Sequence, residues 1–355
     1  MSRDERLGLI ERIEQLRQTH VISYVTSTRP NLESPMAMDV IPVLFRHLQG
    51  LTTPPEETRI DLFIHSNGGE GVVPWRLVSL IREYCSQFSV LVPHHAFSAA
   101  TLTALGADEV FMHPMGMLGP TDATVANEFN PPNPRMPGQV LGISVEDVTS
   151  YIALIRDDVG IHHEDELVQA FLALANQVHP LALGNVKRST SQSRMMGERL
   201  LGRRGGDALD PHQIQEIIDK LTSQLYYHGH PINRREANEE LGLPFVKAAD
   251  GPLSDAMWDL YSAYERLMSL DKPFLPVIDA IQIGGMPPRP APTAPPTITD
   301  VTVGTQKAVY VESLTRCDCY EVDLEVTLVR QADGLCSGQA HQSRVEWTEE
   351  TAADG

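Results

Sequence analysis

A serine and a pair of glycines follow neighbouring apolar segments, where together they would support acyl-transfer chemistry. Ser98 comes after the apolar run 89–92 and opens a segment of small residues with helical spacing. A hydroxyl at the amino end of a helix faces the positive end of the helix dipole, which favours a developing oxyanion. By spacing alone, an ordinary helix N-cap is the commoner interpretation of such a serine.

The glycine pair Gly68–Gly69 directly follows the apolar run 60–64. Glycines permit positive φ and leave their N–H groups unobstructed, which is what an oxyanion hole requires. A tight strand-to-helix turn would use the same two residues. The serine and the glycines in combination are more specific than either feature, and they indicate a serine hydrolase.

The sequence does not identify the base that would take the proton from Ser98. Asp122 follows the third apolar run, but a carboxylate is a poor base for serine near neutral pH unless it is buried or assisted. Lys187 is the first lysine of the chain and begins a polar helical segment, although a lysine base needs a desolvated site. His113, like His94 and His95, is near Ser98 in sequence and could face the site, since it follows a predicted strand, but a core or surface histidine is the commoner interpretation of each. The candidates are therefore Asp122, Lys187, His113 or none.

The segments that must position these residues alternate in the order strand, glycine turn, helix. Apolar runs at 60–64, 89–92 and 109–112 predict buried strands, while 73–84 and 99–105 have helical spacing. This repetition predicts an α/β fold with a parallel sheet. In such sheets the carboxyl ends of the strands build the sites, and that is where the glycines and the serine fall.

The ordered motifs around these segments resemble a known family. The motifs are IHSNGG at 64–69, VP at 92–93, AFSAAT at 96–101, ALGADEV at 104–110 and LGPTD at 118–122. Together they resemble the serine dehydrogenase proteinase family, which belongs with the Clp-type and signal-peptide-peptidase-type serine peptidases. The resemblance covers roughly residues 5 to 250. It implies an α/β fold of the crotonase/Clp-protease type, a superhelix of ββα units, with added helices and a small C-terminal β appendage.

The resemblance also assigns roles to residues of this chain. It implies that Ser98 is the nucleophile and that Gly69 and Ala99, beside Gly68, supply the oxyanion N–H groups. The family pattern after the serine reads Ala-Gly-Thr, whereas this chain has Ala100 in the middle, whose methyl could crowd the pocket or be harmless. Clp-type peptidases also have a histidine downstream of the serine, and here the corresponding place is held by Asp122 and its neighbours.

The implied activity is that of an ATP-independent serine peptidase, acting on a peptide or protein substrate inside a homo-oligomer. The alternative is a catalytically silent scaffold or peptide-binding member of the same fold. A crotonase-type acyl-CoA enzyme is a third possibility by fold analogy, and the serine in its family context argues against it.

No cofactor or metal is expected. The glycine-rich region has no lysine to hold pyridoxal phosphate. His228 and His230 would supply only two metal ligands, and Cys317, Cys319 and Cys336 lack the spacing of a four-ligand zinc site.

Charge and hydropathy restrict the partners and the location. The formal net charge is −19 and no basic run offsets it, which argues against nucleic acid and anionic membrane surfaces as partners. No window approaches the roughly 20 apolar residues of a membrane span, and the charged N-terminus does not resemble a signal peptide. We therefore expect a cytoplasmic protein without an integral membrane segment.

Composition predicts the domain organisation. A peptidase domain is expected over 1–283, a proline-rich linker over 284–297, a C-terminal β appendage over 298–348 and a disordered tail over 349–355. Within the first domain, the proline-rich stretch 127–138 is expected to form a loop or lid. Ser144, followed by acidic residues, is expected to begin a helix.

Overall fold

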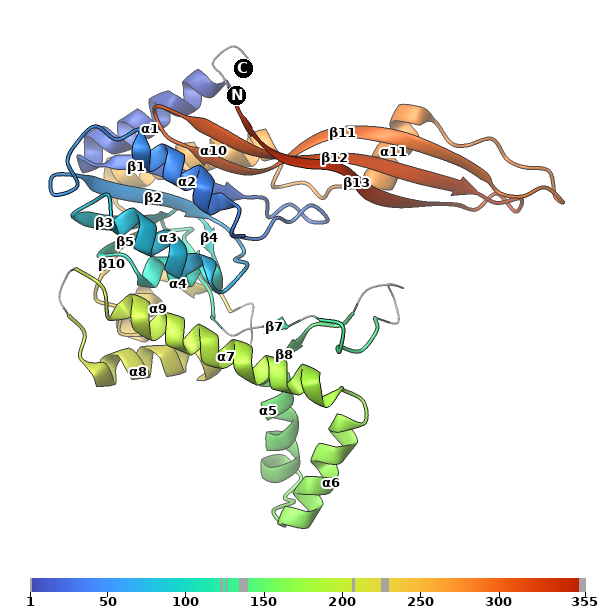
Figure 1. Cartoon of the computed structure of the whole chain (residues 1–355), viewed down its shortest axis with the longest axis horizontal. Coiled ribbons are helices and arrows are strands. Elements are labelled where there is room, and N and C mark those ends of the chain that lie inside the picture. Colours follow the sequence, from blue (N-terminus) through green and yellow to red (C-terminus); the bar gives the residue numbers. More distant parts are fainter. Residues whose placement is uncertain are drawn as a thin grey trace.

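The computed structural model of the chain describes residues 2–121, 124–125, 127–133, 140–205, 208–224 and 230–350. These residues form a mixed α/β protein built on an eight-stranded sheet (Figure 1). The strand order is β10-β5-β3-β2-β1-β11-β12-β13. The first five of these strands run parallel to one another, and the last three are antiparallel.

The parallel half of the sheet contains the three predicted strands. Its members are β1 (His20–Thr26), β2 (Arg59–His65), β3 (Gln87–Val92), β5 (Glu109–Met112) and β10 (Val246–Ala248). Their residues are almost wholly buried because helices cover both faces, which explains why the runs are continuously apolar rather than alternating. The predicted strands at 60–64, 89–92 and 109–112 are confirmed.

Two groups of helices cover the two faces of the sheet (Figure 1). One face packs against α2 (Val40–Gln49), α3 (Val73–Arg82) and α4 (Ala99–Leu105), with α7 (Pro180–Leu201) outside α4. The other face packs against α1 (Arg3–Arg17) and α10 (Gly251–Met268). Alternate residues of β2 supply the two cores, Leu62 and Ile64 facing α2–α4 and Phe63 facing α10.

Smaller elements surround the carboxyl ends of the parallel strands. A three-stranded sheet joins β4 (His95–Ala96), β6 (Met117–Leu118) and β9 (Ile232–Asn233), and β7 (Thr124–Val125) pairs with β8 (Ile143–Ser144). The remaining helical segments are α5 (Val145–Ala153), η1 (Leu154–Asp158), α6 (Glu164–Ala175), α8 (Pro211–Asp219), η2 (Lys220–Gln224) and α9 (Arg234–Glu239). The predicted helix start at Ser144 is confirmed, since its hydroxyl accepts a hydrogen bond from the Asp147 N–H at 3.0 Å.

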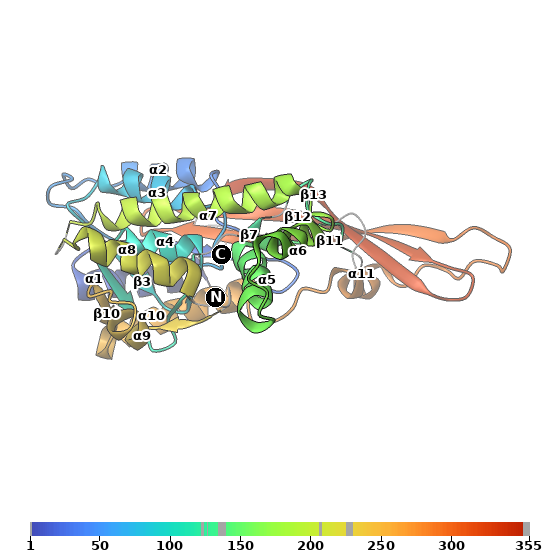
Figure 2. The same cartoon turned by 90° about the horizontal axis from the view of Figure 1, so that it is seen from below.

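The C-terminal strands extend the main sheet. They are β11 (Thr297–Glu312), β12 (Cys317–Arg330) and β13 (Cys336–Glu349), and α11 (Pro276–Gly284) packs against them. β11 pairs antiparallel with β1, with Val25 opposite Tyr310. The far ends of the three strands project as a long arm, which Figure 2 shows from below. The strands contain 16, 14 and 14 residues and occupy almost the range given to the expected β appendage, 298–348, but they continue the main sheet instead of forming a separate unit.

Some expectations fall at the edges of the described residues. Within the expected tail 349–355, residues 351–355 lie outside the described part of the chain, whereas Glu350 forms an ion pair with Arg6. The expected loop 127–138 is described only up to residue 133. Over the described ranges, no single helix has the length and hydropathy of a membrane span; α6 and α7 meet the criterion only as a pair, bent by 99°.

Candidate active site

Ser98 lies in the turn between β4 and α4. Its backbone has φ 51° and ψ −112°, a combination that residues other than glycine rarely adopt. Its side chain caps no amide of α4, so it does not act as an ordinary N-cap serine. Backbone strain of this kind persists only where the surroundings hold it, and it concentrates at functional sites.

Thr101 holds the Ser98 turn in place from inside α4. Its fully buried hydroxyl lies 2.7 Å from the Ala96 carbonyl oxygen and 2.9 Å from that of Gly119. It also accepts a hydrogen bond from the Gly119 N–H at 3.0 Å. One side chain therefore joins the first turn of α4 to β4 before it and to the segment that follows β6.

We expect Thr101→Val to lower the reactivity of Ser98 towards a fluorophosphonate by roughly 10- to 100-fold, because small displacements of a reacting group are costly. Valine has the same shape but leaves the buried polar groups of Ala96 and Gly119 without this partner, at a cost of about 1–3 kcal/mol in stability. The matched control is Thr103→Val, since Thr103 is buried in the same helix and its hydroxyl bonds only the Ala99 carbonyl. Equal labelling rates for the two variants would contradict this role.

Gly68 lies directly against the Ser98 turn. It has φ 99°, and a Cβ added to it would come within 2.7 Å of both the Phe97 carbonyl oxygen and the Ser98 Cβ, and 3.0 Å from the Ala99 nitrogen. Both the backbone conformation and the close approach therefore require glycine.

Gly69 is constrained from the opposite side. An added Cβ there would lie 2.2 Å from the Met36 carbonyl oxygen. Two hydrogen bonds fix the segment against residue 36, from the Met36 N–H to the Gly68 carbonyl at 2.8 Å and from the Glu70 N–H to the Met36 carbonyl at 2.9 Å. The glycine pair is thus clamped between Met36 on one side and residues 97–99 on the other.

Two backbone amides in this clamp have no described hydrogen-bond partner. The Gly68 N–H donates to the Ser66 hydroxyl at 3.0 Å. In contrast, the N–H groups of Gly69 and Ala99 donate to no group in the described part of the chain. A pair of open amides beside a strained serine is the arrangement that stabilises an oxyanion.

None of the expected bases in the described part of the chain is hydrogen-bonded to Ser98. Asp122 lies outside the described residues. Lys187 is exposed on α7 and makes no hydrogen bond to Ser98. Over the described ranges, no side chain is hydrogen-bonded to the Ser98 hydroxyl, although catalytic hydrogen bonds are often formed only in the substrate complex.

Ala100, where the family pattern has glycine, is fully buried, and it belongs to the hydrophobic core between the sheet and α2–α4. The departure from the family pattern therefore adds a methyl group to the core.

A cluster of histidines at the same edge of the sheet is not apparent from sequence. His65 is the last residue of β2, and His94 and His113 follow the ends of β3 and β5. Their rings pack on Tyr261 and Trp258 of α10. The His94 and His95 rings stack with centroids 4.0 Å apart. Their positions after three predicted strands were the available signal, because parallel strands end at the same edge.

Hydrogen bonds decide which of these histidines could accept a proton. The Nδ1 of His113 accepts the Met115 N–H at 3.0 Å, which places the ring proton on Nε2. The Nδ1 of His65 accepts the His95 N–H at 3.3 Å, and its Nε2 faces the Thr28 hydroxyl at 3.1 Å. In the neutral form, neither ring keeps a lone pair for a serine proton. No group of three or more potential ligands in the described part of the chain could hold a metal ion.

The buried histidines predict that stability falls in mild acid. Burial lowers the pKa of His65 well below its usual value, and burial with the neighbouring His94 lowers the pKa of His95 to about 4. In the unfolded chain these two histidines are protonated near pH 6.5, whereas in the folded protein they stay neutral. The stability that depends on the neutral rings is therefore present above pH 6.5 and is lost as the pH falls towards 4.

We expect the melting temperature to fall as the pH is lowered from 6.5 towards 4. In His95→Phe, the loss of unfolding free energy over this pH range should be smaller by about 2 kcal/mol, once the partial exposure of His95 is allowed for. Phenylalanine preserves the stack on Phe97. Scanning calorimetry from pH 7 to 4 measures this, with exposed His212→Phe as the control. Parallel curves for wild type and His95→Phe would refute the assignment.

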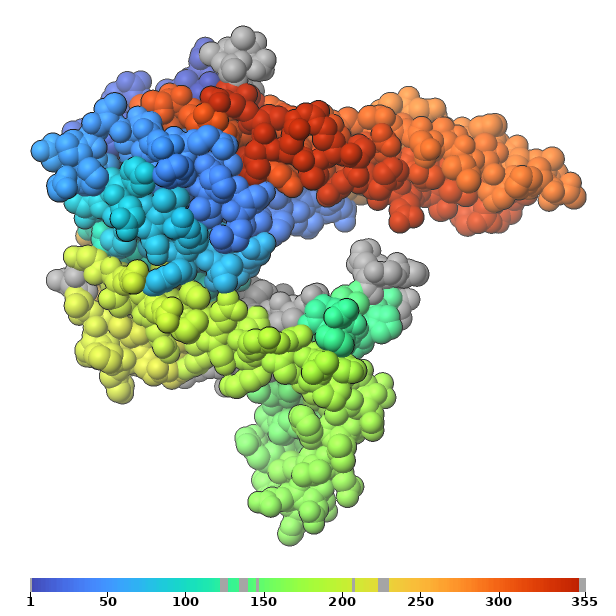
Figure 3. Space-filling view, viewed as in Figure 1, coloured from blue at the N-terminus to red at the C-terminus, as the bar shows by residue number. Residues whose placement is uncertain are grey.

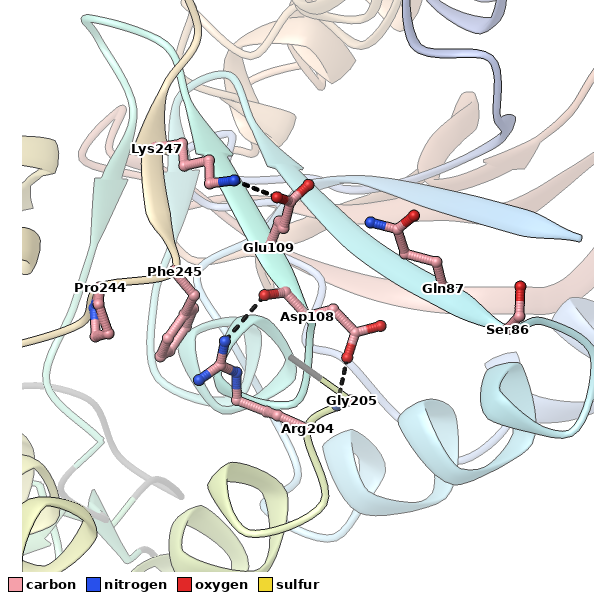
Figure 4. Close-up of a pocket in the computed structure, with 9 residues that line it drawn as sticks. All are labelled: Ser86, Gln87, Asp108, Glu109, Arg204, Gly205, Pro244, Phe245 and Lys247. Carbon is pink, nitrogen blue, oxygen red and sulfur yellow. Dashed lines mark hydrogen bonds and ion pairs between the residues drawn. The ribbon is translucent and has the colours of Figure 1, made fainter. Parts of the chain in front are cut away.

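A cavity of about 530 Å³ lies away from Ser98, at the amino ends of β3, β5 and β10 (Figure 4). Its charged groups make contacts within the protein. Lys247 pairs with Glu109, and Arg204 stacks on the Phe245 ring and donates to the carbonyl oxygens of Ala107 and Asp108. We interpret it as a structural junction, because ligands of such sheets bind at the carboxyl ends of the strands.

A serine, a histidine and an aspartate that do contact one another are buried between α2 and the β11–β12 turn. His47 Nδ1 lies 2.8 Å from the Ser313 hydroxyl and its Nε2 lies 3.1 Å from Asp318. Burial would raise the pKa of Asp318, but hydrogen bonds from His47, Arg316 and Arg46 hold that pKa well below its usual range. Because Asp318 is so strongly paired and Ser313 is enclosed, we interpret this set as a structural link between α2 and the β11–β12 turn, and not as a catalytic triad.

Comparisons with known proteins agree with the geometry. Residues 2–136 match the model of a family described as ClpP-like SDH-type serine proteinase, which confirms the resemblance over a range that contains the glycine pair and Ser98. Two uncharacterized proteins of Methanocaldococcus jannaschii are similar to this chain. MJ1495 is 29% identical over 250 residues, covering 67% of this chain and 70% of its own length. MJ0137 is 35% identical over 219 residues, covering 62% and 63% respectively.

Proposed function

We propose that this chain, whose residues 2–136 match the ClpP-like SDH-type serine proteinases, is a serine hydrolase that cleaves peptide bonds through Ser98. The family implies a crotonase-like fold for this part of the chain. The observation that supports the proposal best is the strained Ser98 turn, which lies against Gly68 and beside the open amides of Gly69 and Ala99.

In this proposal the Ser98 hydroxyl oxygen attacks the substrate carbonyl carbon as its proton passes to a base. The carbonyl oxygen becomes an oxyanion that accepts hydrogen bonds from the Gly69 and Ala99 N–H groups. Collapse of the tetrahedral intermediate expels the amine, which takes up the proton, and leaves an acyl ester on Ser98. Water then attacks the ester in the same way and releases the acid.

Asp122 and Lys187 remain the proposed bases. The variants Asp122→Asn and Lys187→Met separate them, because only loss of the true base lowers the rate and changes its pH dependence. A carboxylate base would need its pKa raised by burial, and a lysine base would need its pKa lowered by desolvation.

Covalent labelling by a fluorophosphonate tests the proposal. Intact mass should increase by one phosphonyl group in wild type and in Ser313→Ala, and should not change in Ser98→Ala. Ser313 is the matched control because it is a buried serine that already contacts a histidine. An unlabelled wild-type protein would reject a hydrolase.

A catalytically silent, peptide-binding scaffold is the second candidate. The observation that favours it is that the Ser98 hydroxyl is hydrogen-bonded to no base in the described part of the chain. A scaffold would bind peptides with similar affinity in wild type and Ser98→Ala, and neither protein would be labelled. For either function we propose a peptide or protein substrate and a homo-oligomeric assembly.

A further inference from the structure

Two exposed arginines, Arg199 near the carboxyl end of α7 and Arg203 just after it, lie beside Trp75 of α3. Trp75, Arg199, Gly202 and Arg203 line a cavity of about 530 Å³, which we call the Trp75 cavity. The guanidinium of Arg203 lies 4.3 Å from the Trp75 ring centroid, and that of Arg199 lies 5.7 Å away. Neither arginine forms an ion pair with another residue in the described part of the chain. In a chain of net charge −19, this is a surface that selects an anionic partner.

Two apolar side chains lie near the cavity residues in sequence. Val72, the residue before α3, precedes Trp75 by three residues, and Met195 precedes Arg199 by four, a spacing that places those two on one side of α7. Both side chains are 38% exposed. Tryptophan and arginine beside apolar contacts are the residue types that dominate protein interfaces. The fitting partner is therefore a protein segment that is both acidic and apolar.

The chain itself contains such a segment. The helical hairpin formed by α5, η1 and α6 (residues 145–175) projects from the body (Figure 3). Five acidic residues lie at its tip, and among the residues that the structure describes only Asp157 has an ion-pair partner, its neighbour Arg156. The acidic residues of the tip are Asp157, Asp158, Glu164, Asp165 and Glu166.

The hairpin also leaves an apolar helix face uncovered. No residue of α6 is buried, and Val168, Phe171 and Leu172 are between 46% and 56% exposed. Their spacing of three and four residues places them on one face. A helix this short is marginal in water without packing, so the exposed face indicates a missing partner.

The cavity and the hairpin cannot meet within one molecule. α6 leads into the amino end of α7, whereas the Trp75 cavity lies at the carboxyl end of α7. α7 has 22 residues, which at about 1.5 Å per residue separate the two features by about 30 Å. Figure 1 shows the hairpin leaving one end of α7 and α8 lying near the other. Contact between them therefore requires two copies.

We propose that copies of this chain associate head to tail, with the acidic tip of one helical hairpin bound in the Trp75 cavity of the next copy. The interface is heterologous, so repetition gives either a closed ring or an open filament. An anionic membrane surface is the poorer partner for the hairpin, because no lysine or arginine lies between Arg156 and Lys187. The inference extends the proposal of a homo-oligomer by naming its contact.

Light scattering of the purified full-length protein tests the contact. Wild type should associate, and the association should weaken as salt rises from about 0.05 to 0.5 M. Arg199→Glu with Arg203→Glu should raise the apparent dissociation constant at least tenfold. Adding Asp157→Arg and Asp158→Arg to that variant should recover most of the loss, since both positions end a helix where cations are tolerated.

The control carries the same change of charge elsewhere, at two exposed arginines, as Arg12→Glu with Arg235→Glu. Circular dichroism confirms that each variant is folded, and labelling of Ser98 is measured in the same samples, so that loss of association is distinguished from failure of the hydrolase. A wild type that is monomeric at tens of micromolar overturns the proposal. So does a control variant that dissociates as readily as the cavity variant, or a cavity variant that associates like wild type.

Discussion

Gly69→Ala should lower the rate of fluorophosphonate labelling at Ser98 by at least about 100-fold, the usual cost of losing one oxyanion donor. The added methyl would lie 2.2 Å from the Met36 carbonyl oxygen and 2.4 Å from the Met36 nitrogen. Real Cβ atoms do not approach backbone so closely, so residues 68–70 must move away from Met36. The Gly69 amide then moves relative to Ser98, and the clamp on the glycine pair is lost.

Gly71→Ala is the matched control for this effect. Gly71 lies in the same loop, but a Cβ added there meets no atom within 4 Å. Labelling of this variant should proceed at the wild-type rate. If Gly69→Ala were labelled as fast as Gly71→Ala, the Gly69 amide would have no part in the chemistry.

Arg6→Met should lower the free energy of unfolding by about 3–5 kcal/mol, because it removes the cation that is hydrogen-bonded to the buried Glu312 and leaves that carboxylate only Arg3, 3.7 Å away. Arg6 is 1% exposed and donates to both oxygens of Glu312, at 2.7 and 3.1 Å, and to Glu350 at 3.0 Å. Tyr264 of α10 also donates to Glu312, at 2.7 Å. The network therefore joins α1, α10 and β11 at one buried point.

Urea unfolding measures this loss as a lower transition midpoint. The control is Arg12→Met on the same helix, whose ion pair with Asp259 is exposed and should contribute less than about 1 kcal/mol. Adding Glu312→Leu to Arg6→Met should recover part of the stability, because the buried charge that has lost its hydrogen-bonded cation is then removed. A loss below 1 kcal/mol for Arg6→Met would show that Glu312 does not depend on this cation.

Local sequence patterns predicted the elements of this fold better than their long-range pairing. The apolar runs of β2, β3 and β5 identify buried strands because both faces of the sheet are covered. The alternation in β11 and β12 also identifies strands, but nothing local indicates that β11 pairs with β1 across nearly 300 residues. Register between distant strands depends on which faces become buried together, and this is a property of the whole chain.

The same holds for the site. The glycines and Ser98 could be predicted from the sequence because only certain residue types permit that backbone and that chemistry. The residues that hold them in place could not be predicted. The backbone of Met36 is hydrogen-bonded to the residues on either side of Gly69, more than thirty positions later in the chain, and the Thr101 hydroxyl donates to the carbonyl of Gly119, eighteen residues later. The histidine cluster likewise forms because three strand ends meet below α10, and no short motif encodes that meeting.

A crystal structure of the protein with a phosphonyl group bound covalently to Ser98 tests the central claim most directly. The phosphonyl oxygen stands where the oxyanion of a tetrahedral intermediate would lie. We predict that it accepts hydrogen bonds from both the Gly69 and the Ala99 N–H groups, at about 2.7–3.1 Å. A phosphonyl oxygen that points into solvent, or an adduct on any residue other than Ser98, would contradict the account.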